Sequence, residues 1–301
     1  MTAAGLREFY RRAGYRVATT LNADWYVPGG RVYRSFPCGK LVAPTREEID
    51  ELSRQRGILG VEFHNAHRLG VASGIWTIRD RDYSPHSVTR QYRQQIHRAA
   101  AHEVVREIDF DELHRLGMRA NHETLARQHH HDAHFSDPRK WRRLCEAGTG
   151  TPGAGVFASF DERELTGYLI YFIVDGTSHG LATKSLDAAR HTGSNHLLYF
   201  EYAHTMIRRE GIDAVEIGAQ WVPPMAGVDR IKRHAGFQLE PYHVAVFLRP
   251  AARTMLLSAC ASLALRAGEH LLGATDGLGR AHALRRVALA TDETAIRIGL
   301  G

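Results

Sequence analysis

Cysteine is scarce in this chain of 301 residues, and Cys38, Cys145 and Cys260 are far apart and odd in number. That pattern argues against a disulfide framework and favours reduced thiols. No run approaches the roughly 20 apolar residues that span a bilayer, and the N-terminus lacks the apolar core of a secretory signal. We therefore expect a cytoplasmic protein with no stable membrane insertion.

Lysine is scarce too. The chain has 39 Lys+Arg, but only four of them are lysine: Lys40, Lys140, Lys184 and Lys232. Because arginine serves wherever a generic cation is enough, Lys232 invites a specific role. The net charge of +6 permits attraction to RNA, a nucleotide or coenzyme A. An arginine-rich composition gives the same charge without any polyanion being bound.

What is present indicates an ordinary globular protein, with 44% hydrophobic and 24% charged residues, long enough for two domains. The pattern predicts helices at 45–57 and 87–103, with Thr45 and Ser87 as caps. A hairpin is expected around Asp175-Gly176, then a helix over 195–209, a buried strand over 214–218, a short helix over 227–234 and a strand ending at Pro250. Apolar and cationic helices follow.

This order of elements resembles the acyltransferase fold of the GNAT superfamily, and within it the FemAB-like branch. The resemblance covers residues 85–250 well and the residues before Ser87 loosely. It rests on the helix from Ser87, the Asp137–Trp141 helix start, the pattern at 194–204, and the Ile-Lys-x-x-x-Gly-Phe run at 231–237. It implies an α/β (α+β) fold with two tandem GNAT-like domains, a degenerate one at 1–86 and a catalytic one at 87–250. A helical tail at 251–301 would follow, whose apolar part at 254–265 could pack on a second copy.

The chemistry that the resemblance implies is attack of an amine on an activated acyl carbonyl, giving an amide. This reaction needs alignment of the substrates, a proton acceptor and donors for the oxyanion. The lysine of the family pattern falls on Lys232, which would face the donor phosphate or the oxyanion, with Arg233 beside it. The alternative is an exposed lysine on a short helix.

The donor is indicated less clearly. Arg190, Gly193, Ser194 and Asn195 partly match the turn that cradles the pyrophosphate of acyl-CoA, but Asn replaces its small last residue, and Ser194 and Asn195 could simply be helix caps. FemAB-like enzymes often take an aminoacyl group from charged tRNA instead. Its phosphates would suit two basic clusters: Arg90, Arg93 and Arg98, and Arg139, Lys140, Arg142 and Arg143. We favour aminoacyl-tRNA over acyl-CoA; either is a co-substrate, not a bound cofactor.

For the general base the sequence offers Glu201 and His204, three residues apart on one helix, with Glu216 and His243 as further candidates. Gln220 and Trp221 follow a buried strand, where ligands tend to sit in open sheets. With Tyr202 and Phe237, they are expected to line the acceptor or acyl pocket. The acceptor could be a cell-wall precursor, a peptide or a secondary metabolite. A non-catalytic module that binds a nucleotide or RNA is the alternative of a different class.

Two further motifs are discounted. Residues 148–153 fit G-x-G-x-x-G, but a helix is expected before them and a strand after them, the reverse of a dinucleotide site. His129, His130, His131 and His134 have no HExxH frame, and adjacent histidines point in different directions on a helix. No metal site is expected.

Overall fold

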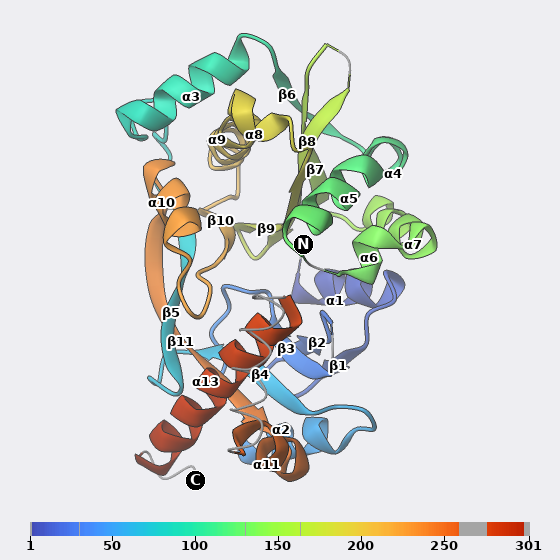
Figure 1. Ribbon diagram of the computed structural model, residues 1–301, viewed down its shortest axis with the longest axis vertical. Coiled ribbons are helices and arrows are strands. Elements are labelled where there is room, and N and C mark those ends of the chain that lie inside the picture. The colour runs from blue at the N-terminus through green and yellow to red at the C-terminus, as the bar shows by residue number, and fades with distance from the viewer. Residues whose placement is uncertain (1, 30, 130, 163, 259–275, 298–301) are drawn as a thin grey trace. The chain divides into compact units, whose positions relative to one another are not determined.

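The computed structural model describes residues 2–29, 31–129, 131–162, 164–258 and 276–297 of an α/β protein (Figure 1). The chain forms two compact units, and neither is contiguous in sequence. Unit 1 consists of Met1–Gly14, Ile75–Gly218 and Met225–Glu240, and unit 2 of Tyr15–Gly74, Ala219–Pro224 and Pro241–Gly301. Strands β5 (Val71–Ile78) and β11 (Gln238–Leu248) have residues in both units. The contiguous division at 1–86, 87–250 and 251–301 stays a prediction.

Unit 1 is built on a mixed sheet with the strand order β10-β9-β8-β7-β6. Strands β6 to β9 pair in antiparallel fashion, and β10 is parallel to β9. Asp175 and Gly176 both have positive φ, at 47° and 77°, as the tight turn of a two-residue hairpin requires. The predicted hairpin is therefore confirmed. The strand bounds are β6 (Val104–Ile108), β7 (Ala154–Phe160), β8 (Leu165–Val174), β9 (Thr177–Ser185) and β10 (Ala214–Ala219).

Helices cover both faces of this sheet. On one face α3 (Arg90–Ala100) and α9 (Ser194–Met206) share a core with strand residues such as Leu169 and Val215, and Figure 1 shows α3 running beside α9. On the other face α1 (Ala3–Arg12) places Phe9 with its ring 4.5 Å from that of Phe172. The first helix of the chain thus packs in unit 1, because Leu6, Phe9 and Tyr10 form a buried stripe.

Several of the remaining helices of unit 1 start at a side-chain cap. The Asp137 carboxylate accepts from the backbone N–H of Arg139 and Lys140, and Pro138 occupies the first turn of α7. Helix α3 instead begins after Thr89, whose hydroxyl accepts from Tyr92 N. The prediction of Ser87 as its cap is wrong. The bounds are α4 (Phe110–Leu116), α5 (Met118–Arg127), α6 (Ala133–Ser136), α7 (Pro138–Thr149), α8 (Ala189–Thr192) and α10 (Ala226–His234).

Unit 2 has the strand order β1-β2-β3-β4-β11, with a core that includes Trp25 and Phe63. Its helix α2 (Arg46–Arg54) starts with the predicted Thr45 cap, and Glu48 completes a capping box. The C-terminal helix packs on this unit, since Thr294 accepts a hydrogen bond from Gly70 N at 2.9 Å. The bounds are β1 (Val17–Thr19), β2 (Asp24–Tyr26), β3 (Val32–Phe36), β4 (Gly60–Asn65), α11 (Pro250–Leu257) and α13 (Asp276–Arg297). Residues 259–265 of the segment expected to pack on a second copy lie outside the described residues.

Candidate functional site

The parallel strands β9 and β10 pair only over their first residues, 177–179 opposite 214–216. A Cβ placed on Gly180 would lie 3.1 Å from the carbonyl oxygen of Glu216 and 3.6 Å from Ile217 Cα, so the strands still touch there. Beyond that point β9 runs on to Ser185 and β10 to Ala219, with no further pairing between them in the part of the chain described. We call the opening between residues 180–185 and 217–218 the fork. Backbone groups of the fork that are not bonded elsewhere can accept an extended ligand.

A β-bulge decides which side chains of β9 share a face of the fork. Leu181 has no partner in β8, because the register shifts between Ile170 and Tyr171. His179 and Lys184 are five residues apart and would face opposite sides of a regular strand. The extra residue brings them to the same side. The pairs are Phe172↔His179, Tyr171↔Gly180, Ile170↔Ala182 and Tyr168↔Lys184.

The neighbours of β8 identify that side. The Tyr171 ring lies 5.8 Å from the ring of Tyr202 on α9, so Tyr171 faces α9. The partners of His179 and Lys184 pack the other way, Phe172 against α1 and Tyr168 against Trp141 of α7, the latter at 6.0 Å. His179 and Lys184 therefore face away from α9.

A histidine and a glutamate pair at the closed end of the fork. His179 Nδ1 lies 2.7 Å from Glu216 Oε2, and their side chains are 13% and 7% exposed. Because the carboxylate accepts, the hydrogen belongs on Nδ1, which leaves Nε2 of the neutral ring able to take a proton. A carboxylate that orients an imidazole is the usual arrangement of a general base. Glu216 was a sequence candidate, whereas His179 was missed.

Lys232 lies on α10 and is only 8% exposed. Its Nζ donates to the carbonyl oxygen of Gly218, in the β10 arm of the fork, at 3.4 Å. The alternative of an exposed lysine is therefore wrong. Its neighbour Arg233 points elsewhere, with its guanidinium carbon 5.9 Å from the centre of the Trp76 ring. The structure thus brings Lys232, but not Arg233, to the fork.

Side chains at the start of α9 bond to the neighbouring strands β7, β8 and β9. Gly193 has a φ of 86° and is the N-cap residue, with no side-chain cap, so Ser194 and Asn195 are not caps. Ser194 is fully buried, with Oγ 3.2 Å from Ser159 Oγ and 3.1 Å from Thr166 Oγ1. The Asn195 amide donates to Ser185 Oγ at 3.1 Å. The side chain of Arg190 lies outside the described residues. The side chains of Ser194 and Asn195 are thus engaged inside the protein, whereas backbone N–H groups of the turn can receive an anion.

Helix α3 crosses the same turn. A Cβ on Gly193 would lie 3.0 Å from the backbone oxygen of Gln95. A cavity of about 330 Å³ opens beside this contact, between α3, α9 and α10. Its lining is polar and partly cationic, and comprises Gln91, Tyr92, Gln95, His196, Arg230, Ile231 and His234.

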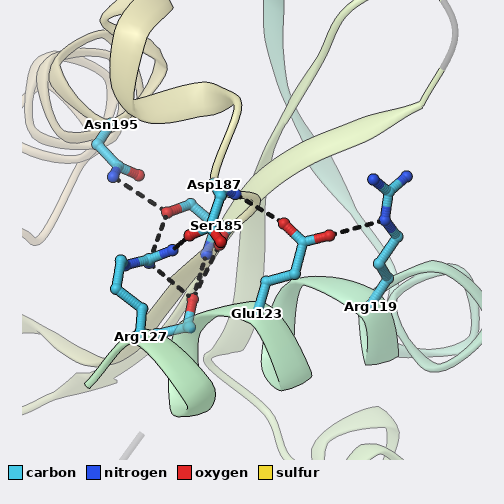
Figure 2. Close-up of polar contacts among 7 residues, drawn as sticks. Arg119, Glu123, Arg127, Ser185, Asp187 and Asn195 are labelled. Carbon is cyan, nitrogen blue, oxygen red and sulfur yellow. Dashed lines mark hydrogen bonds and ion pairs between the residues drawn. The ribbon is translucent and has the colours of Figure 1, made fainter. Parts of the chain in front are cut away.

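Helix α5 fixes the far end of β9, as Figure 2 shows. The Thr124 hydroxyl donates to Ser185 O and accepts from Ser185 N, both at 2.9 Å. The Glu123 carboxylate accepts from Asp187 N at 2.7 Å, and Arg127 forms an ion pair with Asp187. These bonds set where the β9 arm of the fork ends.

The two base candidates on α9 lie elsewhere. Burial raises the pKa of Glu201, and burial together with the charge of Arg208 lowers the pKa of His204. His204 stacks on Phe200 at 5.2 Å. Among the described residues, no hydrogen bond joins either of them to the His179–Glu216 pair. His243 lies on the part of β11 that belongs to unit 2.

The expected pocket residues divide into two groups. Tyr202 and Phe237 are 0% and 2% exposed and lie in the core of unit 1, not on an open surface. Gln220 and Trp221 belong to unit 2, where Gln220 N donates to Gly74 O at 2.8 Å and Trp221 is 54% exposed.

The basic clusters are partly committed to internal contacts. Arg93 donates to Pro85 O and Val88 O, Arg142 pairs with Glu146, and Arg143 donates to Arg12 O at 2.6 Å. The exposed cations of the two clusters are Arg90 and Arg98 on α3, and Arg139, Lys140, Arg142 and Arg143 on α7. Since α3 and α7 cover opposite faces of the sheet, the two sets do not form one patch.

Among the described residues, no group of three or more His, Cys, Asp or Glu side chains is placed to hold a metal ion. His130 lies outside them. Helix α7 ends at Thr149 and β7 begins at Ala154, which confirms the helix-then-strand order around 148–153. None of the described helices has both the length and the apolar character needed to cross a bilayer.

No protein-family model and no curated protein sequence matches this chain. Solved structures do resemble it. FemX aligns with a TM-score of 0.56 at 11% identity, over 85% of this chain and 94% of that one. A DUF2156 C-terminal domain from Agrobacterium fabrum gives 0.54 at 14% identity, over 88% and 91%. L-PGS from Bacillus licheniformis gives 0.51 at 13% identity, over 81% and 86%. Identities this low establish the fold alone: the chain has the GNAT-type fold of these proteins.

Proposed function

We propose that this chain is a GNAT-type acyltransferase that transfers an aminoacyl group from aminoacyl-tRNA to an amine, forming an amide bond. The observation that carries the proposal is the fork, with His179 and Glu216 at its closed end and the Lys232 ammonium on its β10 arm. These groups supply what aminolysis of an activated acyl group needs: a proton acceptor, and a cation near the reacting carbonyl.

The proposed reaction uses these groups in sequence. The acceptor nitrogen attacks the acyl carbon, a C–N bond forms, and the nitrogen loses a proton to His179 Nε2. Glu216 stabilises the resulting imidazolium through the 2.7 Å contact at Nδ1. Lys232 stabilises negative charge on the carbonyl oxygen or on a donor phosphate. The C–O bond of the tRNA ester then breaks, and the imidazolium returns the proton to the leaving oxygen.

Three features favour tRNA as the donor. The side chains of Ser194 and Asn195 are engaged inside the turn, and α3 lies against Gly193, which leaves little room to cradle a pyrophosphate. The exposed Arg90 and Arg98 on α3, and Arg230 in the adjacent cavity, offer cations to a phosphate backbone.

Acyl-CoA is the second candidate donor, and one observation favours it. Gly193 adopts the left-handed conformation directly before a helix of 13 residues. The first-turn N–H groups of such a helix attract a phosphate.

The test uses two labelled donors, charged tRNA and acyl-CoA, each offered with a mixture of small amines and short peptides. Label in an alkali-stable amide that disappears after RNase treatment of the donor supports tRNA; transfer from acyl-CoA alone would replace it by the second candidate. The matched control is His102→Asn, because His102 is exposed in unit 1 and away from the fork. A folded protein that binds tRNA but transfers label from neither donor would be a binding module.

A further inference from the structure

A second buried lysine, Lys184, lies at the far end of the β9 arm and is 9% exposed. Within the described part of the chain, no hydrogen bond or ion pair reaches its ammonium, which instead lies over the Phe135 ring, 4.7 Å from Nζ to the centroid. A buried charge without a direct hydrogen-bond or ion-pair partner is costly. The nitrogen is not fully enclosed and still touches solvent.

The charged residues near Lys184 have partners of their own. Asp132 caps α6, accepting from His134 N at 3.0 Å, and lies 3.6 Å from His134 Nδ1. Arg127 is paired with Asp187. Burial lowers the pKa of Lys184; Asp132 opposes that effect and Arg127 adds to it. An added oxyanion would therefore meet an ammonium that has no direct hydrogen bond or ion pair among the described residues, although the Asp132 carboxylate acts on it from a distance.

Three aromatic side chains pack beside Lys184. The Phe135 and Trp141 rings lie 5.8 Å apart, and Trp141 in turn lies 6.0 Å from Tyr168, the cross-strand partner of Lys184. All three aromatic residues are at most 5% exposed. The ammonium thus lies between a paired strand and packed aromatic side chains, which favours recognition of one fixed position over loose attraction.

The bulge at Leu181 places Lys184 on the same face of β9 as His179. Five strand residues span roughly 16 Å, somewhat less with a bulge. We propose that Lys184 binds the carboxylate or phosphate of the amine acceptor while His179 takes the proton from its nitrogen. This inference rests on the proposed function. It defines the acceptor as an anionic amine whose charge lies about 10–15 Å from the reacting nitrogen, the span of a peptide of about three or four residues.

The test uses trialanine, trialanine amide, and a peptide amide of the same length that ends in phosphoserine. We expect calorimetry with the wild-type protein, without donor, to show tighter binding of trialanine or of the phosphopeptide than of the amide, by about 10–100-fold. Whichever is tighter identifies the oxyanion. Lys184→Met keeps the apolar stem and should remove the preference, and Lys184→Arg should restore part of it. Lys40→Met, at an exposed lysine of unit 2, is the control and should retain it.

In the transfer assay Lys184→Met should raise KM for the anionic acceptor by a similar factor and leave kcat nearly unchanged. If Lys184→Met does not fold, reductive methylation of wild-type Lys184 provides the same test, because the anionic peptide should protect it. Equal binding of all three peptides, or no protection, overturns the role of Lys184. Loss of transfer with the binding preference intact would overturn the proposed function and leave this site standing.

Discussion

The His179–Glu216 pair makes the most direct prediction, through His179→Asn, Glu216→Gln and the double variant. Asn can still donate a hydrogen bond to Glu216 from near the Nδ1 position, so the buried carboxylate keeps a partner. It cannot accept a proton as imidazole does. Removal of a general base costs about 10²–10⁴-fold in rate, or about 3–5 kcal/mol.

Glu216→Gln keeps a hydrogen-bonding group within reach of His179 but removes the negative charge. A hydrogen bond to a charged group contributes about 1.5–3 kcal/mol and a neutral one about 0.5–1.5 kcal/mol. The 2.7 Å contact is largely shielded from water, so the loss should be about 1–1.5 kcal/mol, or roughly 5–15-fold in kcat/KM. The double variant should be no slower than His179→Asn, because Glu216 acts only through that ring.

The assay is the rate of label transfer for the three variants and for His102→Asn, with thermal denaturation to verify that each protein is folded. Wild-type kcat/KM in the His179→Asn variant would refute a base role for His179. If Glu216→Gln lowered kcat/KM in the His179→Asn variant by the same factor as in the wild-type protein, Glu216 would act independently of His179. That result would also refute the pairing.

Three further predictions concern other parts of the chain. Lys232→Met should lower kcat/KM by about 10²–10³-fold with a small change in melting temperature, whereas an effect on stability alone would make the lysine structural. Burial opposes ionisation of Glu48, but hydrogen bonds from Asn22 and Thr45 lower its pKa to about 2. The ionised carboxylate therefore stabilises the folded protein by about 1–2 kcal/mol after solvent screening. This contribution is complete above about pH 4.5 and is lost as the pH falls toward 2. Urea unfolding should show Glu48→Gln less stable at pH 7 with the difference fading below pH 4.5, and a constant difference would contradict this. Gly148→Ala should cost about 1–3 kcal/mol, because its methyl group would overlap the Phe110 ring; an unchanged denaturation midpoint would show that the ring can move.

Local signals in the sequence predicted much of the fold. The Asp175-Gly176 turn, the Thr45 cap and the helix near 195–209 all follow from short-range chemistry, in which turn conformation or a free backbone N–H decides the structure. The predicted cap at Ser87 failed because Thr89 lies closer to the first helical turn, while Ser87 Oγ accepts from Ser84 N in the preceding loop.

The candidate site was less predictable, because it depends on contacts between strands. His179 is a lone histidine in a strand-like run, and no spacing rule links it to Glu216, which lies 37 residues away. The rarity of lysine was a usable signal: Lys232 and Lys184 are buried, whereas Lys40 and Lys140 are exposed. That rarity marks Lys184 as well, but the bulge that turns Lys184 toward the face of His179 has no sequence mark.

Unit 1 is assembled from three separate segments of the chain, and this affects the order in which it can fold during synthesis. Phe9 on the first helix can contact the Phe172 ring only after Phe172 has left the ribosome, and Phe172 follows Phe9 by 163 residues. At about 5–20 residues per second, Phe9 waits roughly 10–30 s for this partner. The N-terminal helix is thus a natural binding segment for a nascent-chain chaperone, and a shortened chain that began after it would leave the Phe172 face of the sheet bare.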